Sequence, residues 1–170
     1  MVSIDIKIVW GSSMLNVNIP GFKNFEFENI VFDFNGTLAK DGKVDVELLK
    51  LIRKLSEKIN VYVLSADTYG NVRSTFSEEP VKVIITSKEN GTLDKMNFIN
   101  EIGNSSTIAV GNGRIDSKML EVAALSIAIL GDEGAARLAI LASDIIVKNP
   151  IDAVELLLNP NRLIATLRSY

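Results

Sequence analysis

The 170-residue sequence contains no cysteine and no histidine. Without cysteine there are no disulfide bonds and no thiol catalysis, and without histidine there is no imidazole acid–base chemistry. Together the two absences remove nearly every structural zinc arrangement. Any nucleophile, acid or base must therefore be an aspartate, glutamate, serine, threonine, lysine or tyrosine.

The sequence also has no large excess of charge of either sign and no long apolar run. The 18 basic and 21 acidic residues are scattered and give a formal net charge of −3, with no Lys/Arg block, so we expect no nucleic-acid partner. The most apolar region, 123–130, ends at Gly131-Asp132-Glu133 and is too short to cross a bilayer. The first residues also lack the pattern of a signal peptide. We therefore expect a soluble, cytoplasmic protein with no membrane partner.

Short apolar runs alternate along the chain with segments of helical periodicity, which is typical of a parallel sheet covered by helices on both faces. We predict a Rossmann-like three-layer α/β sandwich, built as a single domain over residues 1–170 with its core in residues 28–170. The predicted strands are 30–32, 61–64, 81–85, 107–110, 126–130 and 145–147. The predicted helices are 48–59, 93–102, 119–124, 135–142, 153–158 and 160–168.

Two β-hairpins are predicted outside this alternation. Within residues 1–27, apolar residues alternate at 4–8 and again at 15–19, on either side of Gly11-Ser12-Ser13. A shorter turn signal, Asp41-Gly42, follows 38–39 and precedes Val44. Both hairpins are candidate assembly surfaces for a homo-oligomer, and the alternative is that they are edge strands that protect the sheet.

The strongest chemical signal is Asp33-Phe34-Asn35-Gly36-Thr37, which directly follows the first predicted core strand. Ligands of an open α/β sheet bind beyond the carboxyl ends of the strands, so this string lies at the expected edge. Gly36 lets backbone amides approach an anion, and Thr37 adds a hydroxyl donor. Taken alone, such a string is more often a polar strand-to-loop turn.

Three other segments offer partners for a phosphate group. Ser65 ends the predicted strand 61–64, Lys95 opens a helix, and Gly111-Asn112-Gly113-Arg114-Ile115-Asp116 follows the strand 107–110. Phosphoryl transfer needs such a hydroxyl, a lysine to neutralise charge, and oxygen ligands for magnesium. Each residue could singly be a turn cap, a solvated charge or a turn residue. Their joint order makes those separate explanations less plausible.

In that order the motifs resemble those of the haloacid dehalogenase superfamily, in particular soluble proteins similar to the phosphorylation domain of P-type ATPases. The resemblance covers roughly residues 28–148 and rests on 33–37, 64–67, Lys95 and 111–117. It implies a capless core and an aspartyl-phosphate formed on Asp33. It also implies a phosphate site made by Gly36, Thr37, Ser65, Ala66 and Lys95, and a Mg²⁺ site made by Asp33, Asn35, Asn112 and Asp116.

Two residues depart from the family pattern. Asn35 stands where phosphatases of the family usually carry an acid/base aspartate, and an amide cannot exchange a proton in that role. Breakdown of the intermediate should therefore be slow or depend on other groups. Asn112 replaces the first acidic residue of the magnesium loop, so it offers an oxygen without a charge and magnesium affinity should be weaker. Asp116 must then supply the anion of the loop, directly or through water.

The spacing of the motifs leaves no room for an inserted cap domain, because Asp33, Ser65 and Lys95 follow one another at intervals of 32 and 30 residues. An open site suits a macromolecular substrate, or a small one enclosed by a neighbouring subunit, as in the capless sugar-phosphate phosphatases that form tetramers. We predict a phosphatase or phosphotransferase for a small phosphomonoester. The alternative is a regulatory or scaffolding module that binds magnesium and phosphate but turns over little, which Asn35 and Asn112 favour.

Overall fold

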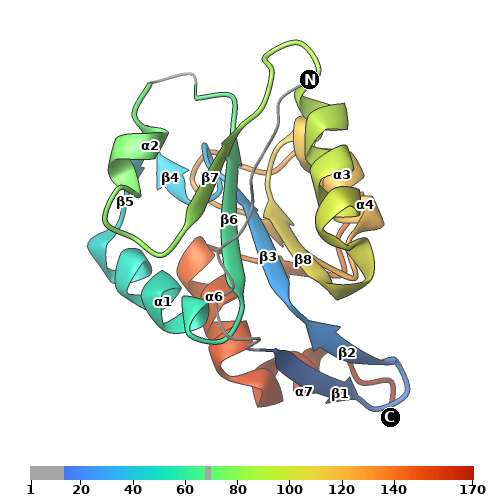
Figure 1. The fold of residues 1–170 in the computed structure, drawn as a ribbon. Helices are drawn as coiled ribbons and strands as arrows, with labels where there is room; N and C mark the ends of the chain where they lie inside the picture. The colour runs from blue at the N-terminus through green and yellow to red at the C-terminus, as the bar shows by residue number, and fades with distance from the viewer. Residues whose placement is uncertain (1–13, 68–69) are drawn as a thin grey trace.

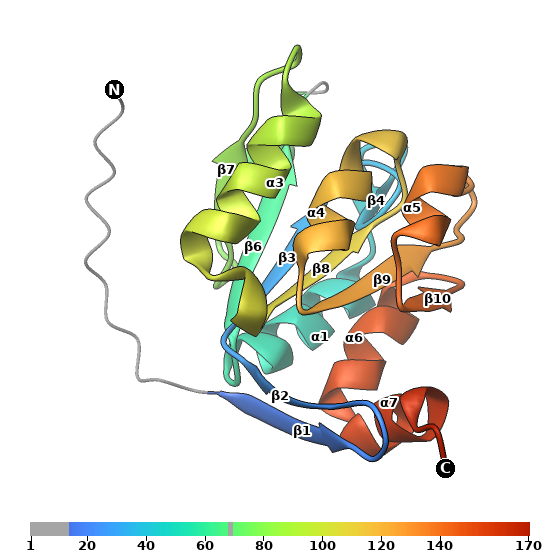
Figure 2. The ribbon, with the colours of Figure 1, turned by 90° about the vertical axis from the view of Figure 1, so that its right-hand side faces the viewer.

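The computed structural model describes residues 14–67 and 70–170, in which a six-stranded parallel sheet lies between two layers of helices (Figures 1 and 2). The strand order is β10-β9-β8-β3-β6-β7, so β3 lies inside the sheet. The α/β sandwich and all six core strands are confirmed, each strand to within one residue at either end. The strands are β3 (Asn29–Asp33), β6 (Asn60–Ser65), β7 (Lys82–Ile85), β8 (Thr107–Gly111), β9 (Leu125–Ile129) and β10 (Ile145–Val147).

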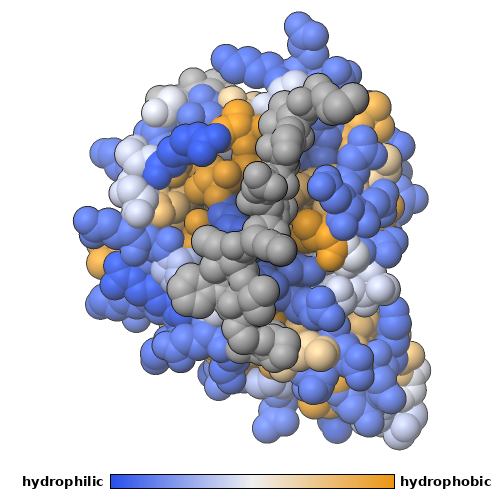
Figure 3. Space-filling view, viewed as in Figure 1, coloured by the Kyte–Doolittle hydropathy of each residue, from blue (hydrophilic) through white to orange (hydrophobic). Residues whose placement is uncertain are grey.

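Alternate residues of each central strand enter different halves of the core. In β3, Ile30 and Phe32 pack on the side of α1 (Val46–Ser56) and α6 (Pro150–Leu158), whereas Val31 packs on the opposite side. That opposite face is covered by α3 (Gly91–Ile102), α4 (Ser117–Val122) and α5 (Arg137–Leu141), as Figure 2 shows. Fully burying one large apolar side chain stabilises a fold by roughly 1.5–3 kcal/mol. On the face drawn in Figure 3, hydrophilic residues predominate and hydrophobic ones form small patches.

Polar caps set where the helices of the first face begin. The carboxylate of Asp45 accepts a hydrogen bond from the amide of Glu47 at 2.7 Å, which starts α1. Asn149 caps α6 in the same way through the amide of Asp152 at 2.8 Å, with Pro150 at the first helical position. Both helices begin two or three residues before their predicted starts, because the cap, not the first buried apolar residue, fixes the first turn.

The shorter predicted hairpin is confirmed as β4 (Ala39–Lys40) and β5 (Lys43–Val44), which we call the flap. Its turn residues Asp41 and Gly42 have φ values of 50° and 74°, the positive values that a two-residue hairpin turn requires. The flap forms its own two-stranded sheet, and the edges of the central sheet are β7 and β10. The prediction that the flap protects a sheet edge is therefore wrong.

The longer predicted hairpin is only partly open to comparison, because residues 4–8 lie outside the described residues. Residues 15–19 do form a strand, β1 (Leu15–Ile19), which pairs antiparallel with β2 (Lys23–Phe27). The strand β2 was not predicted, and β1 and β2 also form a sheet separate from the central one. The helix α7 (Pro160–Leu167) packs against β1, and the amide of Ser169 donates to the carbonyl of Pro20 at 3.3 Å.

The segments between the motif strands are short. Between β3 and β6 lie only the flap and α1, and between β6 and β7 the described residues add only α2 (Val72–Thr75), which was not predicted. This part of the chain therefore contains no inserted cap domain, as the motif spacing predicts. None of the helices in residues 14–67 and 70–170 is long and apolar enough to cross a membrane.

Candidate active site

Three charged side chains meet at the carboxyl edge of the sheet. Asp33 is the last residue of β3, and its Oδ1 lies 2.5 Å from Nζ of Lys95, which projects from α3. The same Nζ lies 2.6 Å from Oδ1 of Asp116, which follows β8. The three residues are 7%, 0% and 0% exposed. The fold thus joins residues that are 62 and 21 positions apart into one buried cluster.

Two carboxylates share one ammonium in this cluster, so a surplus negative charge is buried. Burial raises the pKa of Asp33 to about 6, and the charge of Asp116 adds to the rise, while the charge and hydrogen bond of Lys95 and the Thr37 hydroxyl oppose it. Burial acts to lower the pKa of Lys95, but Asp33 and Asp116 outweigh it and hold that pKa above its ordinary range. Lys95 therefore carries its charge at neutral pH.

Thr37 joins the nucleophile loop to the loop that follows β8. Its Oγ1 lies 3.1 Å from Oδ2 of Asp33 and 3.1 Å from Oδ1 of Asn112. A hydroxyl has a single hydrogen to donate, so one of these two acceptors is left without a donor. Gly36, with φ +77°, packs directly against Asn112, because a Cβ at this position would lie 2.5 Å from Nδ2 of Asn112.

The loop 111–116 holds the Asp116 carboxylate by its backbone. Oδ2 of Asp116 accepts hydrogen bonds from the amides of Asn112 at 3.1 Å and Gly113 at 2.8 Å. Gly111 is required beside it, since a Cβ there would lie 2.6 Å from Cβ of Asp116. Because Oδ1 contacts Lys95, both oxygens of Asp116 are already engaged. A contact between Asp116 and a metal through a bound water is therefore the simpler arrangement.

The donor set at this site fits magnesium. The described residues contain no cluster of three acidic side chains, but Mg²⁺ usually binds through one or two carboxylates and keeps several waters. Here the surplus negative charge of Asp33 and Asp116 is one that a divalent cation would offset. The unpaired acceptor facing Thr37, Oδ2 of Asp33 or Oδ1 of Asn112, is an oxygen of the kind that magnesium prefers.

The remaining predicted residues lie beside the cluster without bonding to it. Ser65 ends β6, the strand next to β3, and is 2% exposed, but its Oγ accepts from the amide of Asp67 at 2.9 Å. Ala66 follows it and is half-buried. Asn35 is also half-buried, and its Oδ1 has no hydrogen-bond partner in the described part of the chain. The amide of Gly36 already donates to the carbonyl of Ala39 at 2.8 Å, so a phosphate contact from this amide would replace that bond.

One residue at this edge was missed by the sequence analysis. Thr86 directly follows β7, and its amide donates to the carbonyl of Ser65, the last residue of β6, at 2.9 Å. The residue is 8% exposed, and its hydroxyl has no partner among the described residues. The sequence feature that could have identified Thr86 is its position directly after a predicted apolar strand, which is the criterion that identified Ser65.

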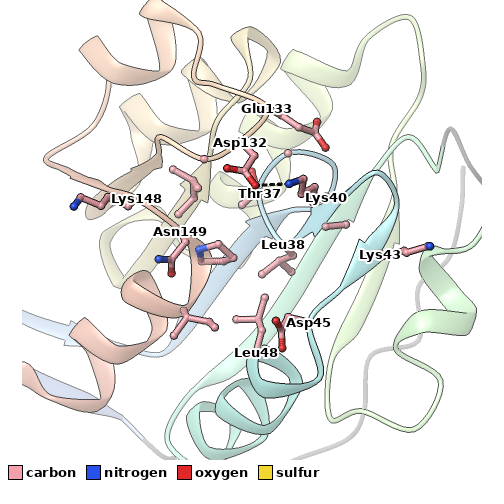
Figure 4. A pocket seen from close by; sticks show the side chains of 16 residues that line it. Thr37, Leu38, Lys40, Lys43, Asp45, Leu48, Asp132, Glu133, Lys148 and Asn149 are labelled. Atoms are coloured by element: carbon pink, nitrogen blue, oxygen red, sulfur yellow. Dashed lines mark hydrogen bonds and ion pairs between the residues drawn. The ribbon is translucent and has the colours of Figure 1, made fainter.

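A pocket of about 230 Å³ lies next to the nucleophile loop, on the side of α1 and α6 (Figure 4). Its apolar lining includes Leu38 and Leu48, and an ion pair between Lys40 and Asp132 lies at its rim. Thr37 lines this pocket and also bonds to Asp33, so the pocket and the charged cluster share a wall.

The raised pKa of Asp33 predicts a pH-dependent stability difference in metal-free protein. Since the folded state binds the Asp33 proton more tightly than the unfolded chain does, this stabilisation is complete below pH 3.8 and is lost as the pH rises through about 6. An Asp33→Asn variant has no carboxyl group to titrate at this position, so its stability lacks this pH dependence. The free energy of unfolding of this variant, relative to wild type, should therefore rise by about 2 kcal/mol between pH 4 and pH 7.

Urea unfolding in the presence of EDTA at several pH values measures this difference. Asp144→Asn is the matched control, because Asp144 bonds to Ser126 at the opposite end of the sheet. If the curves for wild type and Asp33→Asn stay parallel from pH 4 to 7, the Asp33 pKa is not raised.

Replacing Lys95 by methionine is expected to destabilise the metal-free protein strongly at pH 7. The change leaves Asp33 and Asp116 buried side by side without a cation, and breaking a buried ion pair in this way costs about 3–5 kcal/mol. Lys118→Met, at an exposed position of α4, is the control. Chemical denaturation at pH 7 checks the prediction, and a loss below about 1 kcal/mol would contradict it.

No protein-family model matches the chain. The chain is 54% identical over 65 residues to the uncharacterized protein MJ0073 of Methanocaldococcus jannaschii, a match that covers 38% of the chain and 70% of that protein. It is 44% identical over 39 residues to the uncharacterized protein MJ0072 of the same organism, covering 23% of the chain and 89% of that protein.

Solved structures resemble the chain over more of its length. The cobalt-bound deoxy-D-mannose-octulosonate 8-phosphate phosphatase of Haemophilus influenzae has a TM-score of 0.66 at 18% identity, covering 78% of this chain and 88% of that one. The corresponding phosphatase of Moraxella catarrhalis, in complex with magnesium, phosphate and KDO, has a TM-score of 0.62 at 18% identity, covering 84% and 94%. A putative hydrolase of the superfamily from Legionella pneumophila has a TM-score of 0.63 at 12% identity, covering 83% and 87%. The chain therefore has the fold of the haloacid dehalogenase superfamily hydrolases, and it belongs to one family with MJ0073.

Proposed function

We propose that this chain is a magnesium-dependent phosphatase that acts on a small phosphomonoester through an aspartyl-phosphate on Asp33. The observation that carries the proposal is the buried cluster of Asp33, Lys95 and Asp116 at the carboxyl edge of the sheet. A carboxylate nucleophile with an ammonium 2.5 Å away is equipped to approach a dianionic phosphoryl group. The phosphatase structures with the same fold support this proposal.

In the first step, a carboxylate oxygen of Asp33 attacks phosphorus as the bond from phosphorus to the substrate alcohol breaks. Lys95 neutralises part of the phosphoryl charge, and Ser65 donates its hydroxyl hydrogen to a phosphoryl oxygen. Mg²⁺ bound by Asp33, the carbonyl of Asn35, Asn112 and, through water, Asp116 would supply further charge neutralisation. The departing alkoxide takes its proton from water, because Asn35 has none to give.

In the second step, water attacks phosphorus and the bond to Asp33 breaks, which releases inorganic phosphate and restores the carboxylate. A carboxylate two residues after the nucleophile would accept the proton of that water, and Asn35 cannot. Hydrolysis of the aspartyl-phosphate is therefore the slow step of this chain, and the intermediate accumulates.

We propose a sugar phosphate or a compound of similar size as the substrate. The Moraxella catarrhalis structure contains phosphate and KDO, and in this chain no inserted domain covers the site within the described residues. A neighbouring copy of a homo-oligomer would close such a site, with the flap at the contact. We also propose that this chain is similar to the phosphorylation domains of P-type ATPases and that it works in the cytoplasm.

Release of inorganic phosphate from p-nitrophenyl phosphate and a panel of sugar phosphates tests the proposal. The assay is run with Mg²⁺ or with EDTA, and we expect turnover only with Mg²⁺. Equal turnover in EDTA would contradict the metal requirement. Absence of turnover at high protein concentration on every substrate would contradict the phosphatase.

The second candidate function is a module that binds magnesium and phosphate with little turnover. Asn35 and Asn112 favour it, because both amides stand where the family uses carboxylates. Calorimetric binding of phosphate in the presence of Mg²⁺, without release of alcohol from p-nitrophenyl phosphate even in a first turnover, would favour this module over the enzyme.

A further inference from the structure

Asn112 uses both ends of its side-chain amide. Its Nδ2 donates to the carbonyl of Gly134 at 3.1 Å, and its Oδ1 lies 3.1 Å from Oγ1 of Thr37. Its backbone carbonyl accepts from the amide of Ala136 at 2.8 Å. The residue is 9% exposed and packs against Gly36. Asn112 is therefore wedged between the nucleophile loop and the loop 131–136.

An aspartate at this position could not make the same contacts. The carbonyl of Gly134 is an acceptor only, and an ionised carboxylate has no hydrogen to donate to it. Two acceptor oxygens would then face each other in a buried place, which costs more than the loss of one hydrogen bond. The amide at 112 is thus the side chain that this neighbourhood requires.

The loop 131–136 in turn holds the flap. Asp132 forms an ion pair with Lys40, and Oε1 of Glu133 accepts from the amide of Asp41 at 3.1 Å. The loop is closed on itself by a hydrogen bond from the amide of Gly134 to the carbonyl of Gly131 at 2.9 Å. Figure 4 shows the pair of Lys40 and Asp132 above the apolar pocket. A continuous series of contacts therefore runs from Asp33 through Thr37, Asn112 and this loop to the flap.

We infer that Asn112 is a positioning residue that links the flap to the nucleophile loop, and we call this series of contacts the tie. Its amide lacks the charge that an aspartate would bring to the metal site, but it supplies the hydrogen-bond donor on which the tie depends. The inference rests on the proposed function only in treating the flap as a wall of the substrate site. The contacts themselves belong to the metal-free chain, so they can be tested without substrate.

The test compares Asn112→Asp and Asn112→Ser with wild type by ¹⁵N NMR in metal-free protein. Both variants lose the hydrogen bond from Nδ2 to Gly134, and the serine side chain is too short to replace it, so amide exchange at Ala136 should become at least about tenfold faster and the order parameters of residues 40–43 should fall. Lys40→Met removes the ion pair at the flap end and leaves the bond from the Asp41 amide to Glu133, so it should lower the order parameters of the flap and leave exchange at Ala136 unchanged.

Magnesium binding and kinetics distinguish the loss of the contacts to the flap from the change of charge at residue 112. Asn112→Asp should bind Mg²⁺ about tenfold more tightly than wild type and Asn112→Ser should not, because only aspartate adds a charge. At saturating Mg²⁺, Lys40→Met should raise KM for a sugar phosphate about fivefold with kcat changed less than twofold, and Asn112→Ser should raise KM by a similar factor. A merely structural loss at Asn112 would not reproduce the KM effect of Lys40→Met.

A rigid flap in both Asn112 variants would overturn the inference, as would unchanged exchange at Ala136. An unchanged magnesium affinity in Asn112→Asp, with the flap loosened as expected, would instead leave the tie in place and contradict the metal site of the proposed function. If Asn112→Asp fails to fold, Asn112→Ser still decides the question, because it introduces no buried charge.

Discussion

Replacing Asp33 by asparagine is expected to lower the rate of phosphate release at least about a thousandfold. The amide has the size of the carboxylate but not its charge or nucleophilicity, so no aspartyl-phosphate forms. Asp116 shares the Lys95 ammonium with Asp33, but both of its oxygens are already engaged, Oδ1 by Lys95 and Oδ2 by the amides of Asn112 and Gly113. No neighbouring carboxylate can therefore take over the attack.

Rapid mixing with p-nitrophenyl phosphate measures this loss and the intermediate together. Wild type should release a burst of close to one p-nitrophenol per chain before a slow steady rate, because formation of the intermediate is faster than its breakdown. Asp33→Asn should show neither phase. Asp144→Asn, the same chemical change at the other end of the sheet, should behave as wild type. An Asp33→Asn protein that is folded and keeps a tenth of the activity would exclude Asp33 as the nucleophile.

The central sheet could be predicted because its inner strands β3, β8 and β9 are buried on both faces. Runs such as 30–32 and 108–110 are apolar at every position, and they occur at the intervals that crossover helices require. The same rule placed Asp33, Ser65 and the loop 111–116 at one edge, since all parallel strands end there. The family resemblance implies that Lys95 holds the transferred group, but periodicity cannot predict its contact with Asp33 and Asp116, because this contact depends on where α3 crosses the sheet.

Other features depend on contacts that no local pattern records. The strand β2, with the sequence Lys-Asn-Phe-Glu-Phe, is half polar and becomes a strand by pairing with β1. The second role of Asn112 was hidden for a different reason. Its position in the motif marks it as a metal ligand, but its donation to Gly134 depends on a loop 22 residues further along the chain. The sequence therefore shows that residue 112 lacks a charge, but it does not show that the side-chain amide donates to Gly134.

Asn35 is the other amide in a carboxylate position, and its surroundings differ from those of Asn112. Its Oδ1 is buried and has no hydrogen-bond partner in the described part of the chain, whereas Nδ2 of Asn112 donates to the carbonyl of Gly134 and Oδ1 of Asn112 faces the Thr37 hydroxyl. Nothing described around Asn35 requires the amide oxygen for the fold. A carboxyl group of the same shape can therefore be introduced at 35 at a lower structural cost than at 112.

Replacing Asn35 by aspartate is expected to raise the steady rate of phosphate release by about a hundredfold or more. A carboxyl group at this position can protonate the leaving alcohol and then activate the attacking water, and a positioned acid or base contributes about 10²–10⁴-fold. Since breakdown of the aspartyl-phosphate would no longer be slow, the p-nitrophenol burst should disappear. The rate should also acquire a bell-shaped dependence on pH, as the new group acts first as an acid and then as a base.

Asn71→Asp is the matched control for this variant. Asn71 also has a buried Oδ1 without a partner among the described residues, and its Nδ2 donates to the carbonyl of Gly42 in the flap at 2.8 Å. It therefore adds the same charge near the flap but not two residues after the nucleophile. Only Asn35→Asp should gain turnover. If both variants gain equally, the effect is one of charge, whereas an Asn35→Asp protein that keeps both the burst and the slow steady rate would show that breakdown is not limited by the missing carboxylate.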